Sequence, residues 1–243
     1  MKKLIIILFF ATQIFGQYPD AAHVLRGIDQ NMASENQVVV STMVIHGRRT
    51  SRSITAKSWT EGSEKSFTEY LAPAREKGSK MLKIDDQLWM YSPQSDRVIR
   101  ISGHMLRQSL MGSDLSYEDM MEDRKLYEVY SAEIIGEELI DERDCWIMEL
   151  TAKVDDLAYH SQKLWVDKEY MVPRKQQLFA KSGKMLKVIE LSELFKIDDR
   201  WYPKRMLFQD VLLKGKGTEF IIESIEFDKN IPAHIFSKAS LRK

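Results

Sequence analysis

The residues of this chain that could do chemistry are its histidines, its single cysteine and a serine that follows a glycine. Gly112-Ser113-Asp114 lacks the second glycine of the turn that exposes a nucleophilic serine. Cys145 is the only cysteine, so a zinc site built from several thiolates is excluded. The sequence therefore predicts no metal site, no cofactor and no serine nucleophile. The histidines support this, since none has the His-Glu-x-x-His spacing of zinc ligands on one helix face: His23, His46, His104, His160 and His234.

Adjacent acidic residues are the remaining candidates for catalysis. Glycoside hydrolysis needs two carboxyl groups that face each other about 5 to 10 Å apart. Neighbouring residues of a strand point to opposite sides of the sheet, so adjacent acids do not meet this requirement. We interpret the acidic pairs as solvated turn residues and predict that the protein is not an enzyme. The pairs are Glu137-Glu138, Asp141-Glu142 and Asp155-Asp156.

Charge and cysteine content exclude further classes of function. The chain has 36 basic and 36 acidic residues, whereas a nucleic-acid-binding domain has a marked basic excess. We therefore expect no nucleic-acid partner. A single cysteine allows no internal disulfide bond. No histidine or basic cluster adjoins Cys145 in the sequence, so we expect a buried, unreactive thiol in a strand rather than a reactive one.

The first residues have the order of a secretory signal. Met1-Lys2-Lys3 precede an apolar run from Leu4 to Phe15, and Gly16 follows before a polar stretch. A membrane-spanning helix needs roughly 20 apolar residues, so a permanent anchor is the weaker alternative. We predict a signal peptide at residues 1–16, export, and a single domain over residues 17–243.

Hydrophobic periodicity predicts one helix followed by many strands. Apolar residues at Val24, Leu25, Ile28 and Met32 have the spacing of an amphipathic helix over residues 20–32. No further helices alternate with the strands, which favours an antiparallel barrel or a strongly curved sheet over a parallel α/β fold. Strand-length segments between turn residues are 37–46, 52–60, 65–71, 79–84, 88–91, 97–101, 128–135, 145–153, 159–166, 173–180, 185–195, 201–213 and 218–227.

A methionine-rich segment at residues 104–124 interrupts the strands. It has short helical signals at residues 105–110 and 117–122, and Ser116 with Asp119 has the spacing of a helix cap. Methionine side chains suit either an adaptable apolar binding surface or an irregular core, and both interpretations stay open. The methionines concerned are Met105, Met111, Met120 and Met121.

Ordered motifs over almost the whole chain resemble those of one protein family. They begin with Pro73-Ala74-Arg75-x-Lys77-Gly78 and continue through Trp89, Tyr91, Arg100-Ile101, Gly112-Ser113-Asp114, Tyr117-Glu118-Asp119, Leu164-Trp165-Val166-Asp167, Lys181-Ser182-Gly183-Lys184, residues 227–232 and Phe236-Ser237. In these motifs the chain resembles the outer-membrane lipoprotein-sorting protein-like (LolA-like) family. The resemblance implies a mainly β (α+β) fold. A half-open, curved antiparallel β-barrel would wrap round an apolar cavity, with an N-terminal helix and a short helical lid insert.

The resemblance also implies a function. It points to a periplasmic carrier that binds acyl chains of lipids or lipoproteins for transfer to the outer membrane, with an inner-membrane exporter and an outer-membrane acceptor as partners. We expect a monomer. The alternative is a sensor or transporter-accessory module that uses the same fold to bind a protein. The expected lipid-binding residues are Trp89, Tyr91, Leu106, Leu110, Met111, Leu115, Tyr117, Arg100 and Arg107, with Trp146, Trp165 and Phe208 as further candidates; core packing is the alternative for each apolar one.

Overall fold

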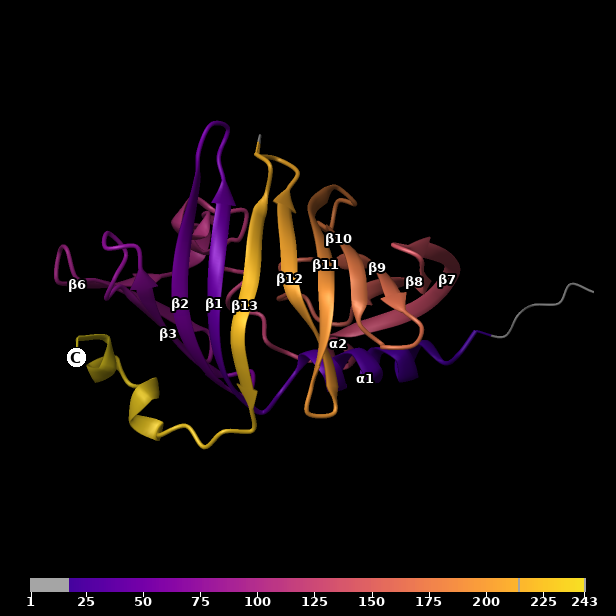
Figure 1. The fold of residues 1–243 in the computed structure, drawn as a ribbon, viewed down its shortest axis with the longest axis horizontal. Coiled ribbons are helices and arrows are strands. Elements are labelled where there is room, and N and C mark those ends of the chain that lie inside the picture. Colours follow the sequence, from indigo (N-terminus) through magenta and orange to yellow (C-terminus); the bar gives the residue numbers. More distant parts are fainter. Residues whose placement is uncertain (1–17, 214, 243) are drawn as a thin grey trace, which may run out of the picture.

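One large antiparallel sheet curves around the helices. The computed structural model describes residues 18–213 and 215–242, and the predicted signal peptide lies outside them. Thirteen strands pair in the order β6-β5-β4-β3-β2-β1-β13-β12-β11-β10-β9-β8-β7. Strands β6 and β7 form the two edges, so the sheet stays open (Figure 1). The predicted curved antiparallel fold with an N-terminal helix is confirmed.

The elements follow one another with short connections. Helix α1 spans Ala21–Met32 and the short helix α2 spans Leu126–Val129. Four 3-10 turns are Gly103–Arg107 (η1), Leu110–Gly112 (η2), Ala233–Phe236 (η3) and Lys238–Arg242 (η4). The strands are β1 (Asn36–His46), β2 (Ser51–Glu61), β3 (Lys65–Ala72), β4 (Lys80–Ile84), β5 (Gln87–Ser92), β6 (Arg97–Ile101), β7 (Tyr130–Ile140), β8 (Arg143–Ala152), β9 (Ser161–Asp167), β10 (Pro173–Phe179), β11 (Met185–Ile197), β12 (Arg200–Asp210) and β13 (Thr218–Phe227).

Helix α1 forms where its sequence predicts. Asp20 caps it, because a carboxylate oxygen of Asp20 accepts a hydrogen bond from the backbone N–H of Ala22 at 3.2 Å. Val24, Leu25 and Ile28 are buried against side chains of α2 and strands β7 to β9. This apolar stripe binds the helix to one half of the curved sheet.

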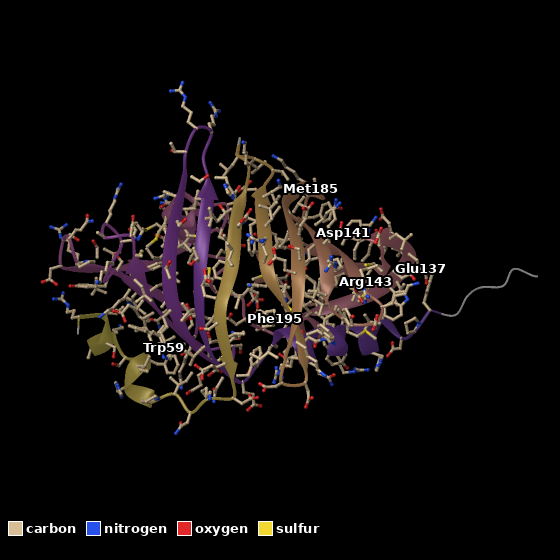
Figure 2. All side chains as sticks on the ribbon, viewed as in Figure 1. Trp59, Glu137, Asp141, Arg143, Met185 and Phe195 are labelled. Carbon is tan, nitrogen blue, oxygen red and sulfur yellow. The ribbon has the colours of Figure 1, made fainter. Side chains whose placement is uncertain are left out.

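The two faces of the sheet are covered by different segments. Adjacent residues of a strand point to opposite sides. In β4, Met81 packs against the segment between β6 and α2, whereas Leu82 packs against residues 231–241. Trp59 of β2 also lies beside this C-terminal segment (Figure 2). We call the segment between β6 and α2 the insert (residues 102–125), and the side of the sheet that holds α1, α2 and the insert the concave face.

Asp29 of α1 fixes the point where the insert ends. Its carboxylate oxygens accept hydrogen bonds from the backbone N–H groups of Leu126 at 2.8 Å and Tyr127 at 2.9 Å. Burial raises the pKa of Asp29, although these two hydrogen bonds act in the opposite direction. The insert is therefore held at one end by β6 and at the other by α2 and α1.

The insert is less helical than its sequence predicts. Only the 3-10 turns η1 and η2 form near the expected helix at residues 105–110, and Met111 has a φ of 50°. Residues 117–121 are turns. The predicted cap contacts do exist: Asp119 accepts a hydrogen bond from the backbone N–H of Ser116 at 2.6 Å, and Ser116 Oγ accepts one from that of Asp119 at 3.2 Å. Local capping is thus achieved without a helix.

Cys145 lies buried in β8, as predicted. Burial raises the pKa of its thiol to about 11, so the thiolate is scarce at neutral pH. Among the described residues, no helix is both long and apolar enough to cross a membrane.

Asp167 connects the end of β9 to Arg143 of β8, which is labelled in Figure 2. Its side chain is 1% exposed and accepts hydrogen bonds from Arg143 Nε at 2.8 Å and Nη2 at 3.0 Å. The backbone N–H groups of Glu169 and Tyr170 also donate to it, each at 3.0 Å. Burial alone would raise the pKa of Asp167, but these hydrogen bonds outweigh it and the pKa lies below its ordinary value.

We predict that Asp167→Asn lowers the free energy of unfolding at pH 7 by about 2 kcal/mol, since hydrogen bonds to a charged group contribute about 1.5 to 3 kcal/mol. Because the pKa of Asp167 is lowered in the fold, its stabilisation is present above the ordinary value of 3.8 and is lost as the pH falls through the folded-state pKa. Urea unfolding should show a smaller deficit near pH 3 than at pH 7.

Asp155→Asn serves as the control for this experiment, because that side chain is 99% exposed. It should change the free energy of unfolding by less than about 0.5 kcal/mol. An equal deficit of the Asp167 variant at both pH values would contradict a role for the carboxylate charge.

Candidate functional site

Apolar side chains of the insert and of the concave face form one cluster. The insert contributes the buried Leu110 and Leu115. Partly buried insert residues pack around them, including all four methionines of the methionine-rich group. The strands contribute Met43, Ile45, Ile54, Ala56, Tyr70, Met81, Leu88 and Ile101, with Phe208 and Phe220 at the margin.

Little empty space remains inside this cluster. A cavity of about 40 Å³ lies between the insert and the sheet, bordered by Leu110, Leu115, Met120, Tyr70 and Phe220 among others. Such a volume has room for a few water molecules at most. The insert therefore occupies the part of the concave face that an apolar ligand could otherwise fill.

Three aspartates of the insert connect it to separate parts of the sheet. The first, Asp114, contacts the neighbouring strands β12 and β13. Its carboxylate accepts hydrogen bonds from Thr218 Oγ1 at 2.7 Å and from the backbone N–H of Asp210 at 3.1 Å. The backbone N–H of Asp114 donates to Thr218 Oγ1 at 3.0 Å. Asp114 and Thr218 are both buried, so this contact is shielded from water.

The second aspartate, Asp119, contacts Lys187 of β11. Lys187 Nζ donates to Asp119 Oδ2, and Tyr159 donates its hydroxyl to Oδ1 at 2.5 Å. The Lys187 side chain is 7% exposed and that of Asp119 13%. Burial, followed by the nearby charge of Asp119, raises the pKa of Tyr159 well above its ordinary value, so Tyr159 is a neutral hydrogen-bond donor.

The third aspartate, Asp123, contacts Lys83 of β4. Lys83 is 2% exposed and donates to the Asp123 carboxylate at 2.7 Å. It also donates to the carbonyl oxygens of Ser63 at 2.7 Å and Met121 at 2.6 Å. Burial raises the pKa of Asp123, and the ammonium group of Lys83 opposes this shift. The three acceptors use all three N–H groups of the buried Lys83 ammonium, so the loss of any acceptor would destabilise the fold.

An open cleft of about 590 Å³ adjoins the insert. Leu115 and Lys187 form part of its inner wall, and the exposed Arg107 belongs to its lining. Leu212 and Leu213, which follow β12, also line the cleft and are 56% and 50% exposed. The cleft therefore joins solvent to the edge of the apolar cluster.

The structure brings most of the predicted lipid-binding residues of the insert together. Leu106, Leu110, Met111, Leu115 and Tyr117 all belong to the concave-face cluster. The further candidate Phe208 joins them, and the backbone carbonyl of Met111 accepts a hydrogen bond from Arg52.

The other predicted residues lie elsewhere. Trp89 and Tyr91 pack against the C-terminal segment on the opposite face. Arg100 of β6 is exposed and pairs with Trp89 in the strand register, so it lies on that same face. Trp146 packs beside α1, and Trp165 donates its indole N–H to Glu138 at 2.5 Å. We do not include these residues in the candidate site.

The sequence interpretation missed the buried lysines. Lys83 and Lys187 each interrupt an apolar stretch, Met81-Leu82-Lys83-Ile84 and Met185-Leu186-Lys187-Val188. A charged residue in such a stretch is a usable signal, because lysine is rarely buried without a partner. Within the part of the chain that the structure describes, no three His, Cys, Asp or Glu side chains gather so as to hold a metal ion.

Solved structures of other proteins have a similar fold. A solved DUF1329 family protein from Desulfovibrio piger has 25% identity and a TM-score of 0.81, covering 90% of this chain and 97% of that one. An outer membrane lipoprotein-sorting protein domain from Vibrio parahaemolyticus has 20% identity and a TM-score of 0.78, covering 91% and 98%. A LolA superfamily protein from Nitrosomonas europaea has 23% identity and a TM-score of 0.75, covering 92% and 100%.

No curated protein matches the sequence. A family model described as that of an uncharacterized protein matches residues 62–243, which is more than half of the chain. The chain therefore belongs to that family, and it shares its fold with the outer membrane lipoprotein-sorting protein domain and with the LolA superfamily protein.

Proposed function

We propose that this protein is a non-enzymatic periplasmic carrier that binds acyl chains of lipids or lipoproteins on its concave face, after the insert has moved aside, for transfer to the outer membrane. The observation that carries the proposal is the apolar cluster between the insert and the sheet. The fold shared with proteins named for lipoprotein sorting supports it. An inner-membrane exporter and an outer-membrane acceptor are the proposed partners.

The energetics of exchange favour an acyl chain as the ligand. Burying a leucine side chain contributes about 1.5 to 3 kcal/mol, so withdrawing Leu110 and Leu115 costs about 3 to 6 kcal/mol. An acyl chain gains about 0.8 kcal/mol per buried CH₂ group, so twelve such groups supply on the order of 10 kcal/mol. A long chain therefore offsets the withdrawal of Leu110 and Leu115, whereas a short apolar molecule does not.

A second candidate function is the binding of a protein partner by the same fold. Val211, Leu212 and Leu213 form a run of exposed apolar residues after β12. Neighbouring exposed apolar side chains are typical of interaction surfaces. A sensor or transporter-accessory module would use this surface without taking up lipid, so lipid uptake distinguishes the two functions.

We predict that the purified protein, residues 17–243, takes up lipid from vesicles of phosphatidylethanolamine and phosphatidylglycerol. Native mass spectrometry should detect the protein with bound phospholipid or fatty acid, because the acyl chain replaces the packing of the insert. A mass without ligand after incubation would reject the carrier function and favour the protein-binding module.

We also predict that fixing the insert to the sheet prevents uptake. The side chains of Asp114 and Thr218 are in contact, so Asp114→Cys combined with Thr218→Cys should form a disulfide bond across them. The oxidised double variant should lose most of its lipid uptake and regain it on reduction. Cys145 is buried and stays in place.

The matched control is Thr218→Cys alone, treated with the same oxidant and reductant. It should take up lipid equally under both conditions. Equal uptake by the oxidised and reduced double variant would show that the ligand enters without displacement of the insert.

A further inference from the structure

Lys187 is a buried cation whose anionic partner, Asp119, belongs to the insert, which the proposed function requires to move. Its ammonium group donates to the carboxylate of Asp119 and lies 5.9 Å from the ring centre of Tyr159. Lys83 differs from it, because Lys83 also donates to the carbonyl oxygen of Ser63, outside the insert. Displacement of the insert would therefore remove the charge partner of Lys187, while Lys83 would keep one acceptor in the turn between β2 and β3.

An unpaired buried ammonium is unfavourable. Removing one partner of a buried ion pair is strongly destabilising, because the remaining charge is poorly solvated. An apolar ligand that displaces the insert would leave Lys187 in this state. A ligand with a carboxylate or phosphate group next to its acyl chain would instead supply a new partner at the same place.

The position of Lys187 suits this exchange. It lines the cleft of about 590 Å³ together with Tyr159 and Leu115, so it stands where the solvent-filled space meets the apolar cluster. A ligand lying across that boundary would have its acyl chain among the apolar side chains and its acidic group near Lys187 and the Tyr159 hydroxyl. Arg107, also in the lining of the cleft, adds a second cation.

We propose that the ligand is an anionic amphiphile whose carboxylate or phosphate replaces Asp119 as the partner of Lys187, an inference that rests on the proposed acyl-chain binding. Asp119 then acts as an internal substitute for the acidic group of the ligand. Asp210 at the end of β12 competes for this role. Asp210 is paired with Lys187 in the β11–β12 register, and its Oδ1 accepts a hydrogen bond from the backbone N–H of Leu212 at 2.8 Å.

The test compares dodecanoate with 1-dodecanol, which have the same chain length and differ in charge. Affinities come from displacement of a fluorescent fatty-acid probe. The wild-type protein should bind dodecanoate at least about tenfold more tightly, since a charge-assisted hydrogen bond contributes about 1.5 to 3 kcal/mol. Inorganic phosphate without a chain should not displace the probe, because the acyl chain supplies most of the binding energy.

Variants assign this preference to Lys187. Lys187→Met should reduce the ratio of the two affinities to about one, with dodecanol still bound, and Lys187→Arg should retain the preference. Asp119→Asn should strengthen dodecanoate binding, because it weakens the internal competitor. Lys181→Met is the matched control, since Lys181 also lines the cleft but is 78% exposed, and it should leave the ratio unchanged.

The outcomes separate this inference from the proposed function. Equal binding of dodecanoate and dodecanol by the wild-type protein overturns the charge exchange but leaves the carrier function intact. In that case Asp210, and not the ligand, would replace Asp119 as the partner of Lys187. A preference that persists in Lys187→Met overturns the assignment to Lys187. Binding of neither amphiphile rejects the proposed function itself, and displacement by phosphate alone would identify an anion site that needs no acyl chain.

Discussion

The structure depends on one constraint, which is that the apolar concave face of a curved sheet cannot be left in water. A half-open sheet has no partner sheet to cover that face, so other segments must do so. Helix α1 covers the half formed by β7 to β9, and the insert covers the half near β1 to β5. The helix is a regular element with its own backbone hydrogen bonds. The insert is mostly turns and depends on its contacts with the sheet.

The contacts of the insert divide into two kinds with different consequences. Leu110 and Leu115 bury apolar surface, and any apolar ligand of similar size can replace that contribution. Asp114, Asp119 and Asp123 make directional contacts that only a matching polar group can replace. Apolar contacts therefore determine how strongly the concave face is covered. The aspartates determine where the insert is held on the sheet, and in the proposed function they would decide which ligands compete with it.

Much of the fold could be predicted from the sequence, because periodicity reports which residues are buried. The stripe of Val24, Leu25 and Ile28 predicts α1, and the turn-punctuated segments predict the strands. The candidate site was harder to predict from the sequence. Periodicity predicts that Trp89 is buried but not which segment covers it, and that segment is residues 231–241, far away in the sequence. The partners of Lys83 and Lys187 are likewise long-range, so no local pattern could identify them.

The attachment of the insert at both ends has a kinetic consequence. Ile101, directly before the insert, belongs to β6, and the other end is held where Asp29 accepts hydrogen bonds from the backbone of Leu126 and Tyr127. An opened insert is therefore a loop with fixed ends, so it gains less chain entropy than a free tail would. Loop motions occur on nanosecond to microsecond timescales. Return of the insert should thus be much faster than loss of a bound molecule. After each molecule leaves, the insert would cover the concave face again before a second molecule could bind there.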